Sequence, residues 1–247
     1  MSIWAEIKRD YRMVSEKDPA ARNALEVILS YPGFNAIIAY RFLHRLHSYG
    51  VPFFPRFLSE VVKFLTGIEI HPNAKIGGGF FIDHGTGVVI GETAEVGEDC
   101  LLYQGATLGG TGKEQGKRHP TLGKGVVVGA GAKVLGNIRI GDYAKIGANS
   151  VVLKPVPDYA VVVGVPGRII KKKVTRLGDE GLEDALDHVH LPDPVEERFH
   201  ELEHQIMELK QTLERMEGKK STMRIYNTQS GKKEDFTTLE PGKVGIY

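Results

Sequence analysis

The chain is poor in several features that would place it in a class at once. It has a single cysteine, Cys100, among 247 residues, which excludes an intramolecular disulfide and favours a reducing compartment. The net charge is only +1, so no overall field attracts nucleic acid or an anionic membrane. No run approaches the roughly 18 apolar residues of a membrane span, and the opening residues lack the apolar core of a secretory signal. We therefore expect a cytoplasmic protein that binds neither nucleic acid nor membrane.

Glycine is abundant instead, at 30 residues, and much of it follows a regular apolar repeat. Within 68–172 an aliphatic residue returns every six positions, whereas antiparallel strands would alternate every two. The three series are Ile70, Ile76, Ile82 and Val88; Ile90, Val96, Leu102 and Leu108; and Leu122, Val128, Val134, Ile140, Ile146 and Val152. Such a short period is typical of a parallel β-helix, in which three units close a triangular coil and residues about 18 apart stack.

The repeat is interrupted over 109–121. The sequence there, "GGTGKEQGKRHPT", cannot fill the interior of a coil, so it predicts an extruded loop. A long loop inside a rigid scaffold is commonly functional. We expect this loop to bring Arg118 and His119 towards His84.

Helices are expected on both sides of the β-helix. Residues 1–67 predict a helical domain, with Asp18-Pro19 starting one helix and Pro32-Gly33 ending it. Residues 173–217 predict a linker and a C-terminal coiled-coil helix, because apolar residues from Val195 to Met216 alternate spacings of four and three. This seam could cover the β-helix wall or pack on copies of itself. The expected fold class is therefore α+β, followed by a polar tail at 218–247.

Three stretches resemble the serine O-acetyltransferase family of hexapeptide-repeat acyltransferases. They are "EIHPNAKIGGGFFIDHGTGVVIGET", "LGGTGKEQGKRHPTLGKGVVVGAGAKVLGN" and "GVPGRI". The resemblance implies a left-handed parallel β-helix that transfers acetyl from acetyl-CoA to the hydroxyl of L-serine, in the first step of cysteine synthesis, without a metal. It also implies a homotrimer or a dimer of trimers, and inhibition by L-cysteine, which shares the head group of serine.

The resemblance also implies the catalytic residues. The family's catalytic histidine matches His84, and its acidic partner matches Glu69, where many relatives have Asp. A neutral imidazole suits the task, because it can take the hydroxyl proton as serine attacks the thioester. A neighbouring carboxylate fixes the tautomer and stabilises the imidazolium that forms.

Substrate and co-substrate positions can be carried over in the same way. Asp18 and Asp83 match residues near the ammonium of serine, and Arg118 can grip its carboxylate with two parallel hydrogen bonds. His119 could bond the substrate or the developing oxyanion. The acetyl-CoA positions match Gly110, Thr111, Ala130, Lys145 and Ala148, which we expect along a groove between neighbouring prisms. Glu92 matches a position near the reaction site without an assigned role.

Three other interpretations stay open. Another hexapeptide acyltransferase could act on a sugar or a xenobiotic alcohol, although a neutral acceptor would leave Asp18, Asp83 and Arg118 unpaired. A zinc hydratase of the γ-carbonic-anhydrase type could use His71, His84 and His119, but the pair of histidines on one strand that this class requires is missing. The chain could also be a regulatory partner of cysteine synthase. Relatives insert a C-terminal isoleucine into that enzyme, whereas this sequence ends in "KVGIY", which argues against the complex.

The tail from Met223 to Tyr247 has a different resemblance. It is similar to the N-terminus of cysteinyl-tRNA synthetase, but it contains neither zinc-ligating cysteines nor a nucleotide-binding motif. We therefore expect residues 223–247 to be passenger sequence without synthetase activity.

Overall fold

The computed structural model describes residues 2–21, 23–112, 115–170, 194–218 and 224–235. Contacts divide the chain into two compact units, Met1–Pro194 and Val195–Tyr247. The predicted linker at 173–193 lies outside the described residues. None of the helices within the described ranges is long and apolar enough to cross a membrane.

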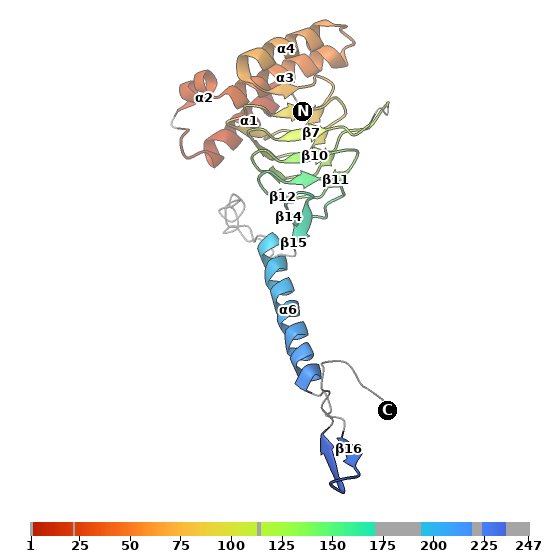
Figure 1. Ribbon diagram of the computed structural model, residues 1–247. Coiled ribbons are helices and arrows are strands. Elements are labelled where there is room, and N and C mark those ends of the chain that lie inside the picture. Colours follow the sequence, from red (N-terminus) through yellow and green to blue (C-terminus); the bar gives the residue numbers. More distant parts are fainter. Residues whose placement is uncertain (1, 22, 113–114, 171–193, 219–223, 236–247) are drawn as a thin grey trace. The chain divides into compact units, whose positions relative to one another are not determined.

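Four helices gather at one end of the first unit (Figure 1). They are α1 (Ile3–Lys17), α2 (Ala24–Ser30), α3 (Pro32–Ser48) and α4 (Phe54–Thr66). The side chain of Ser2 caps the start of α1 by accepting a hydrogen bond from the Ala5 amide. Gly67 ends α4 in the left-handed region at φ 73°, which glycine adopts without a steric penalty.

The predicted helix boundary at Asp18 is wrong. Asp18 follows the last residue of α1, and its carboxylate accepts a hydrogen bond from the Ala20 amide at 2.8 Å, which makes a local turn. The N-cap of α2 is Asn23, whose side-chain oxygen accepts a hydrogen bond from the Glu26 amide at 2.9 Å. The predicted end at Pro32-Gly33 is confirmed, because α2 ends at Ser30, and Pro32 then occupies the first turn of α3, where a missing N–H is tolerated.

A parallel β-solenoid follows the helices, as the six-residue repeat predicts. From β1 to β13 successive strands visit three sheets in rotation, and neighbours pair in parallel except β14 and β15. Sheet A holds β1 (Glu69–Ile70), β4 (Val89–Ile90), β7 (Thr107–Gly109), β10 (Lys133–Leu135) and β13 (Val151–Val152). Sheet B holds β2 (Lys75–Ile76), β5 (Glu95–Val96), β8 (Thr121–Leu122) and β11 (Arg139–Ile140). Sheet C holds β3 (Phe81–Asp83), β6 (Leu101–Tyr103), β9 (Val127–Val128), β12 (Lys145–Ile146), β14 (Val161–Val163) and β15 (Arg168–Ile170).

The stacking distance along the chain varies in a way that locates the insertions. Leu122 pairs with Ile140, 18 residues later, as the repeat predicts. In the first coil Ile70 pairs with Ile90, 20 residues later, so two residues are added in the corner after β3. Val96 pairs with Leu122, 26 residues later, and the predicted loop accounts for the excess. This loop projects from the stack after β7 (Figure 1).

The helices and the solenoid share one hydrophobic core. Ala36, Ile37 and Tyr40 of α3 pack with the aliphatic side chains that point into the first coil. Gly33 permits this close approach, because a Cβ there would lie 2.0 Å from the carbonyl oxygen of Ile82. The predicted division of this unit at residue 67 stays a prediction.

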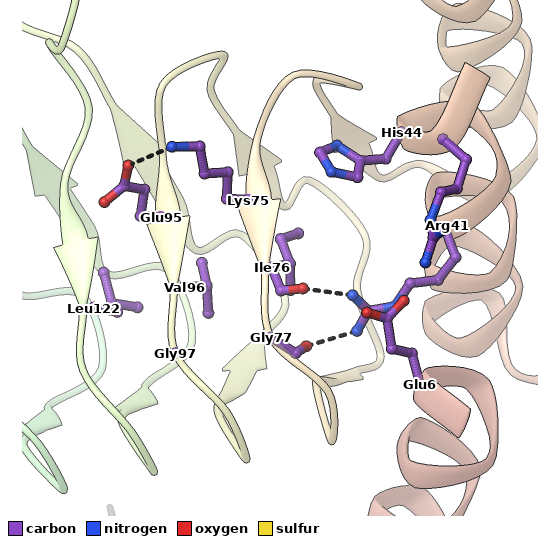
Figure 2. Close-up of a pocket in the computed structure, with 11 residues that line it drawn as sticks. Glu6, Arg41, His44, Lys75, Ile76, Gly77, Glu95, Val96, Gly97 and Leu122 are labelled. Atoms are coloured by element: carbon purple, nitrogen blue, oxygen red, sulfur yellow. Dashed lines mark hydrogen bonds and ion pairs between the residues drawn. The ribbon is translucent and has the colours of Figure 1, made fainter. Parts of the chain in front are cut away.

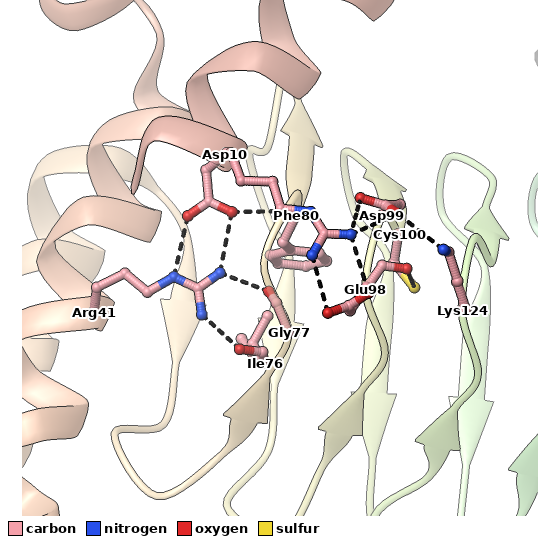
Figure 3. Close-up of polar contacts among 10 residues, drawn as sticks. Asp10, Arg41, Ile76, Gly77, Phe80, Glu98, Asp99, Cys100 and Lys124 are labelled. Carbon is pink, nitrogen blue, oxygen red and sulfur yellow. Dashed lines mark hydrogen bonds and ion pairs between the residues drawn. The ribbon is translucent and has the colours of Figure 1, made fainter. Parts of the chain in front are cut away.

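A buried ion pair fixes α1 and α3 to the first coil (Figure 3). The Arg41 guanidinium contacts the Asp10 carboxylate at 3.1 Å, with side chains 3% and 0% exposed. Arg41 also donates to the carbonyl oxygens of Ile76 and Gly77, at 2.5 and 2.6 Å, while the Phe80 amide donates to Asp10 at 2.9 Å. Burial raises the pKa of Asp10, and the hydrogen bonds from Arg41 oppose that shift.

The second unit contains the predicted C-terminal helix, α6 (Pro194–Gly218). A hairpin follows, in which β16 (Arg224–Asn227) pairs antiparallel with β17 (Lys232–Asp235). The likeness of this tail to a synthetase N-terminus stays a prediction.

We expect Arg41→Met to lower the free energy of unfolding by about 3–5 kcal/mol, because Asp10 would be left as an uncompensated buried charge. The matched control is Lys75→Met, which removes an ion pair to Glu95 whose side chains are 74% and 40% exposed. It should cost less than about 1 kcal/mol. Urea denaturation of both variants measures the difference, and equal losses would contradict a special role for the buried pair.

Candidate functional site

His84 lies at a strained corner of the first coil. It follows β3, its side chain is exposed, and its backbone adopts φ 57°, a left-handed conformation that non-glycine residues seldom take. Gly85 follows at φ 84°, where a Cβ would come within 2.4 Å of the Ile68 side chain. Backbone strain of this kind costs about 1–3 kcal/mol and concentrates at functional sites. The two inserted residues of the first coil therefore build the turn that presents His84.

The turns from sheet C to sheet A stack in a column, which we call the His84 corner. It comprises residues 84–87, 104–105, 130–131 and 148–149 and is held by backbone hydrogen bonds from each turn to the one before. Ala130 and Ala148, predicted to line the arm of acetyl-CoA, lie in this column. The side-chain oxygen of Gln104 is also here, and it is buried without a hydrogen-bond partner among the described residues.

Two predicted carboxylates, Asp83 and Asp18, share two tyrosine neighbours, Tyr31 and Tyr103, whose pKa values are raised by burial and by both carboxylates. Asp83 ends β3 in register with Tyr103 of β6. Asp18 accepts a hydrogen bond from the Tyr31 hydroxyl at 2.7 Å. Burial raises the pKa of Tyr31 to about 12, and the charges of Asp18 and Asp83 add to that shift. Burial also raises the pKa of Tyr103, again with contributions from both carboxylates.

The cluster thus combines two acids with two apolar rings that carry hydroxyl groups. Two negatively charged carboxylates attract a cation that lies between them, so the cluster can hold an ammonium group. The sequence motifs do not single out Tyr31 or Tyr103. The signal for Tyr103 is its place one coil after Asp83, which becomes visible only once the 20-residue register of the first coil is known.

Glu69, the predicted partner of His84, is held by cations of α4. Its carboxylate contacts the Lys63 ammonium at 2.5 Å and the Arg56 guanidinium at 3.8 Å. The hydrogen bond to Glu69 raises the pKa of Lys63. His84 makes no hydrogen bond or ion pair with Glu69 in the described part of the chain. A His84–Glu69 pair would therefore require the carboxylate to leave Lys63.

The second group of predicted residues lies at a different corner. The turns from sheet A to sheet B, residues 71–74, 91–94, 110–112 and 115–120, form what we call the loop corner. Arg118 contacts Glu92 at 2.5 Å, and this hydrogen bond lowers the pKa of Glu92. Gly110 and Thr111 begin the loop and are exposed. Glu92 thus gains a structural role, because it orients the guanidinium of Arg118.

Thr93 organises the end of the loop. Its hydroxyl oxygen accepts hydrogen bonds from the amides of Arg118 and His119, at 3.0 and 3.1 Å. Its own amide donates to Nδ1 of His119 at 3.2 Å, so the neutral ring carries its proton on Nε2. Lys117 donates to the Thr93 carbonyl oxygen at 2.7 Å.

The ring of His119 lies directly over Gly91. A Cβ on Gly91 would come within 2.0 Å of the ring, so any larger residue would displace His119. His119 is 8% exposed, and burial lowers its pKa, with a further lowering from Arg118. The ring is thus a neutral hydrogen-bond donor near neutral pH, which suits it to an oxyanion more than to a proton-accepting role.

The expectation that the loop brings Arg118 and His119 towards His84 is wrong for a single chain. The His84 corner joins sheets C and A, whereas the loop corner joins sheets A and B, so sheet A separates them. The predicted acetyl-CoA positions are also divided between the two corners, since Gly110 and Thr111 lie at the loop corner. Lys145 lies on neither corner but at the start of β12 in sheet C.

This division bears on the zinc interpretation too. His71 belongs to the loop corner with His119, and both have a pKa lowered chiefly by burial. His84 lies at the other corner, so the three histidines do not converge. The described residues contain no group of three His, Cys, Asp or Glu side chains that could hold a metal ion.

A separate cavity of about 570 Å³ lies between the helices and sheet B (Figure 2). Glu6, Arg41 and His44 line it from the helices, and Lys75 and Glu95 line it from the strands. None of the predicted site residues takes part. Arg41 is already bound to backbone carbonyls there, so the cavity is a by-product of the way the helices attach.

The electrostatic arrangement at the loop corner predicts the titration of His119. We expect its pKa to lie below the ordinary histidine value of about 6.5. Arg118→Gln should raise it, because the cation is removed and Glu92 is released from its ion pair. A pH titration of the histidine ring resonances by NMR measures both values, with His119→Asn identifying the resonance. An unchanged pKa in Arg118→Gln would show that the guanidinium does not act on this ring.

Comparisons with known proteins agree with this architecture. Residues 119–154 match the family model "Bacterial transferase hexapeptide (six repeats)". A serine acetyltransferase of Synechococcus elongatus is 56% identical over 191 residues, which cover 77% of this chain and 76% of the relative. A serine acetyltransferase of Bacillus subtilis is 54% identical over 211 residues, which cover 84% of this chain and 94% of the relative.

Solved structures of similar proteins carry ligands. A serine acetyltransferase of Neisseria gonorrhoeae in complex with serine superposes with a TM-score of 0.67 at 44% identity, covering 68% of this chain and 69% of that one. A serine acetyltransferase in complex with CoA gives a TM-score of 0.65 at 46% identity, with 68% and 70% covered. One in complex with cysteine gives 0.67 at 47% identity, with 68% and 70% covered. With its solenoid, its helices and these identities over most of its length, the chain belongs to the serine acetyltransferase family of hexapeptide-repeat acyltransferases.

Proposed function

We propose that the chain transfers acetyl from acetyl-CoA to the hydroxyl of L-serine, with His84 as general base, giving O-acetyl-L-serine and CoA. The observation that carries this proposal is the His84 corner, where an exposed imidazole on a strained turn follows Asp83, a carboxylate that acts on Tyr31 together with Asp18. A base beside an ammonium-binding pair of carboxylates suits an amino-acid alcohol. A neutral sugar would leave those charges unpaired.

The residues divide the steps of the reaction among them. His84 takes the hydroxyl proton as the serine oxygen attacks the thioester carbonyl, and the imidazolium then returns that proton to the departing sulfur. Asp18 and Asp83 bind the ammonium, and Arg118 grips the carboxylate. The Nε2 proton of His119 is free to stabilise the oxyanion. Glu69 would stabilise the imidazolium of His84 once its carboxylate leaves Lys63 and contacts the ring instead.

Acetyl-CoA fits the small residues of the His84 corner. Its pantetheine arm carries amide N–H groups, and the buried oxygen of Gln104 lacks a donor in the described chain. Ala130 and Ala148 stack one coil apart in the same column and leave room for an extended arm. Gly110 and Thr111 would approach this arm from the loop corner of a neighbouring copy, and Lys145 would lie nearby.

The separation of the two corners leads to the proposed assembly. The His84 corner of one copy would meet the loop corner of the next, so that each site takes its base from one chain and its Arg118 and His119 from another. Such a head-to-tail interface closes into a ring. We propose three copies around one axis, the assembly that the family resemblance implies.

The first test measures CoA thiol release from acetyl-CoA with L-serine, alongside homoserine, threonine and a sugar alcohol. We expect release with serine, and a loss of about 10²–10⁴-fold in His84→Ala, the contribution of a positioned base. His204→Ala is the matched control, because His204 is an exposed residue of α6. Glu69→Gln should reduce the rate of CoA release less than His84→Ala does.

Two results would contradict the proposal. Release with the sugar alcohol and not with serine would keep the fold and overturn the substrate. Full activity in His84→Ala would overturn the assignment of the base.

L-cysteine should compete with serine, because it presents the same ammonium and carboxylate to Asp18, Asp83 and Arg118. A cysteine-bound relative superposes on this chain, which supports the same site. We expect cysteine to raise the apparent KM for serine without changing kcat, and Asp18→Asn to weaken both ligands together. Initial rates across a matrix of serine and cysteine concentrations measure the competition. An apparent KM for serine that does not change with cysteine concentration would refute it.

A further inference from the structure

Helix α6 carries an apolar seam. Its members, by sequence, are Val195, Phe199, Leu202, Ile206, Leu209, Leu213 and Met216. The five central ones, from Phe199 to Leu213, are between 40% and 64% exposed. A contiguous apolar stripe of this kind marks an interaction surface on a soluble protein.

The spacing of the seam specifies what covers it. Seven consecutive apolar positions alternate by four and three residues, which is the 3.5-residue period of a coiled coil. A helix lying on a flat sheet would follow the 3.6-residue period of a straight helix, and its apolar stripe would drift around the axis. The strict period keeps the seam facing a second helix of the same kind over the 25 residues of α6.

We propose that α6 forms a parallel coiled coil with α6 of two further copies of this chain, and that this coil keeps the active assembly together at low protein concentration. The proposal rests on the proposed function, in which each site needs residues from two copies. The occupant of the seam is therefore the same helix in the neighbouring chains.

The parallel direction follows from the ring proposed for the solenoid. In a cyclic assembly one rotation axis relates all copies, so every chain leaves the ring at the same end. Three helices that meet on that axis must then run in the same direction. An antiparallel pair would need a different symmetry, and it would not bring the two corners of neighbouring copies together.

The coil has a consequence for catalysis. A second point of attachment makes reassociation of the solenoids intramolecular, which raises their effective concentration. A site shared between copies loses its residues when the copies separate. The coil should therefore show its effect in the dependence of activity on dilution, and little effect on kcat at high concentration.

The first experiment compares charged substitutions on and off the seam in the full chain. Ile206→Asp and Leu209→Asp place a carboxylate in the seam, whereas Met207→Asp places the same group on the same helix outside it. Met207 is 59% exposed, close to the 53% of Ile206, so the three changes are matched in exposure. Sedimentation velocity from nanomolar to micromolar protein measures the mass, and serine-dependent CoA release measures activity over the same range.

We expect the wild type and Met207→Asp to stay trimeric and active on dilution. The seam variants should dissociate and lose specific activity at protein concentrations at least tenfold higher than those at which Met207→Asp does so. Their solenoid should keep the same melting temperature, measured by circular dichroism. If seam and control variants dissociate together, or if the wild type is monomeric throughout, the coil is refuted. Mass is read without the reaction, so a protein that assembles through α6 but ignores serine would overturn the proposed function alone.

A second experiment tests direction. Leu202→Cys lies towards the N-terminal end of α6, so only a parallel coil places this position beside its counterpart and allows a disulfide between copies on mild oxidation. Gln211→Cys, an exposed position off the seam, is the control. Cys100 is buried, and burial raises its pKa to about 12, so it does not compete. Cross-linking by Gln211→Cys and not by Leu202→Cys would overturn the parallel arrangement.

Discussion

The inward stack of aliphatic side chains is the constraint on which the first unit depends. Ile70, Ile90 and Leu108 pair one above another in sheet A, and Val134 and Val152 continue the column. Each residue must lie over its predecessor to stay out of water and to keep its parallel backbone hydrogen bonds. Additional residues can therefore be accommodated only in the corners. The scaffold is rigid along its walls and variable at its edges.

Both groups of candidate functional residues lie at such additions. Two residues inserted after β3 allow the strained turn of His84, and the long insertion after β7 carries Arg118 and His119. Since the insertions occupy different corners, one chain holds two separate parts of the proposed site. Assembly would then create the complete site, so the chemistry of the protein would depend on its association. The seam of α6 would stabilise that association.

A buried ion pair helps to attach the helices to the first coil. Arg41 joins Asp10 to the carbonyl oxygens of the first coil, so α1 is fixed against the solenoid. The residue that follows α1 is Asp18, which accepts a hydrogen bond from Tyr31, and the pKa of that tyrosine is raised by burial and by the charges of both Asp18 and Asp83. An ion pair distant from the reaction thus sets the position of a residue proposed to bind substrate.

The sequence by itself determined the solenoid, its extruded loop and the helices at both ends, because a six-residue aliphatic repeat and the helical spacing of apolar residues each require a particular local structure. The family followed from the resemblance of three motifs. The sequence misplaced the helix start at Asp18, since a capping residue and a turn-forming residue look alike in sequence. Only the tertiary structure decided that Glu69 binds Lys63, that Gly91 seats His119 and that His84 and the loop lie at different corners. These contacts depend on which turns of the chain stack at the same edge of the solenoid. The stacking depends in turn on the number of residues inserted in each coil.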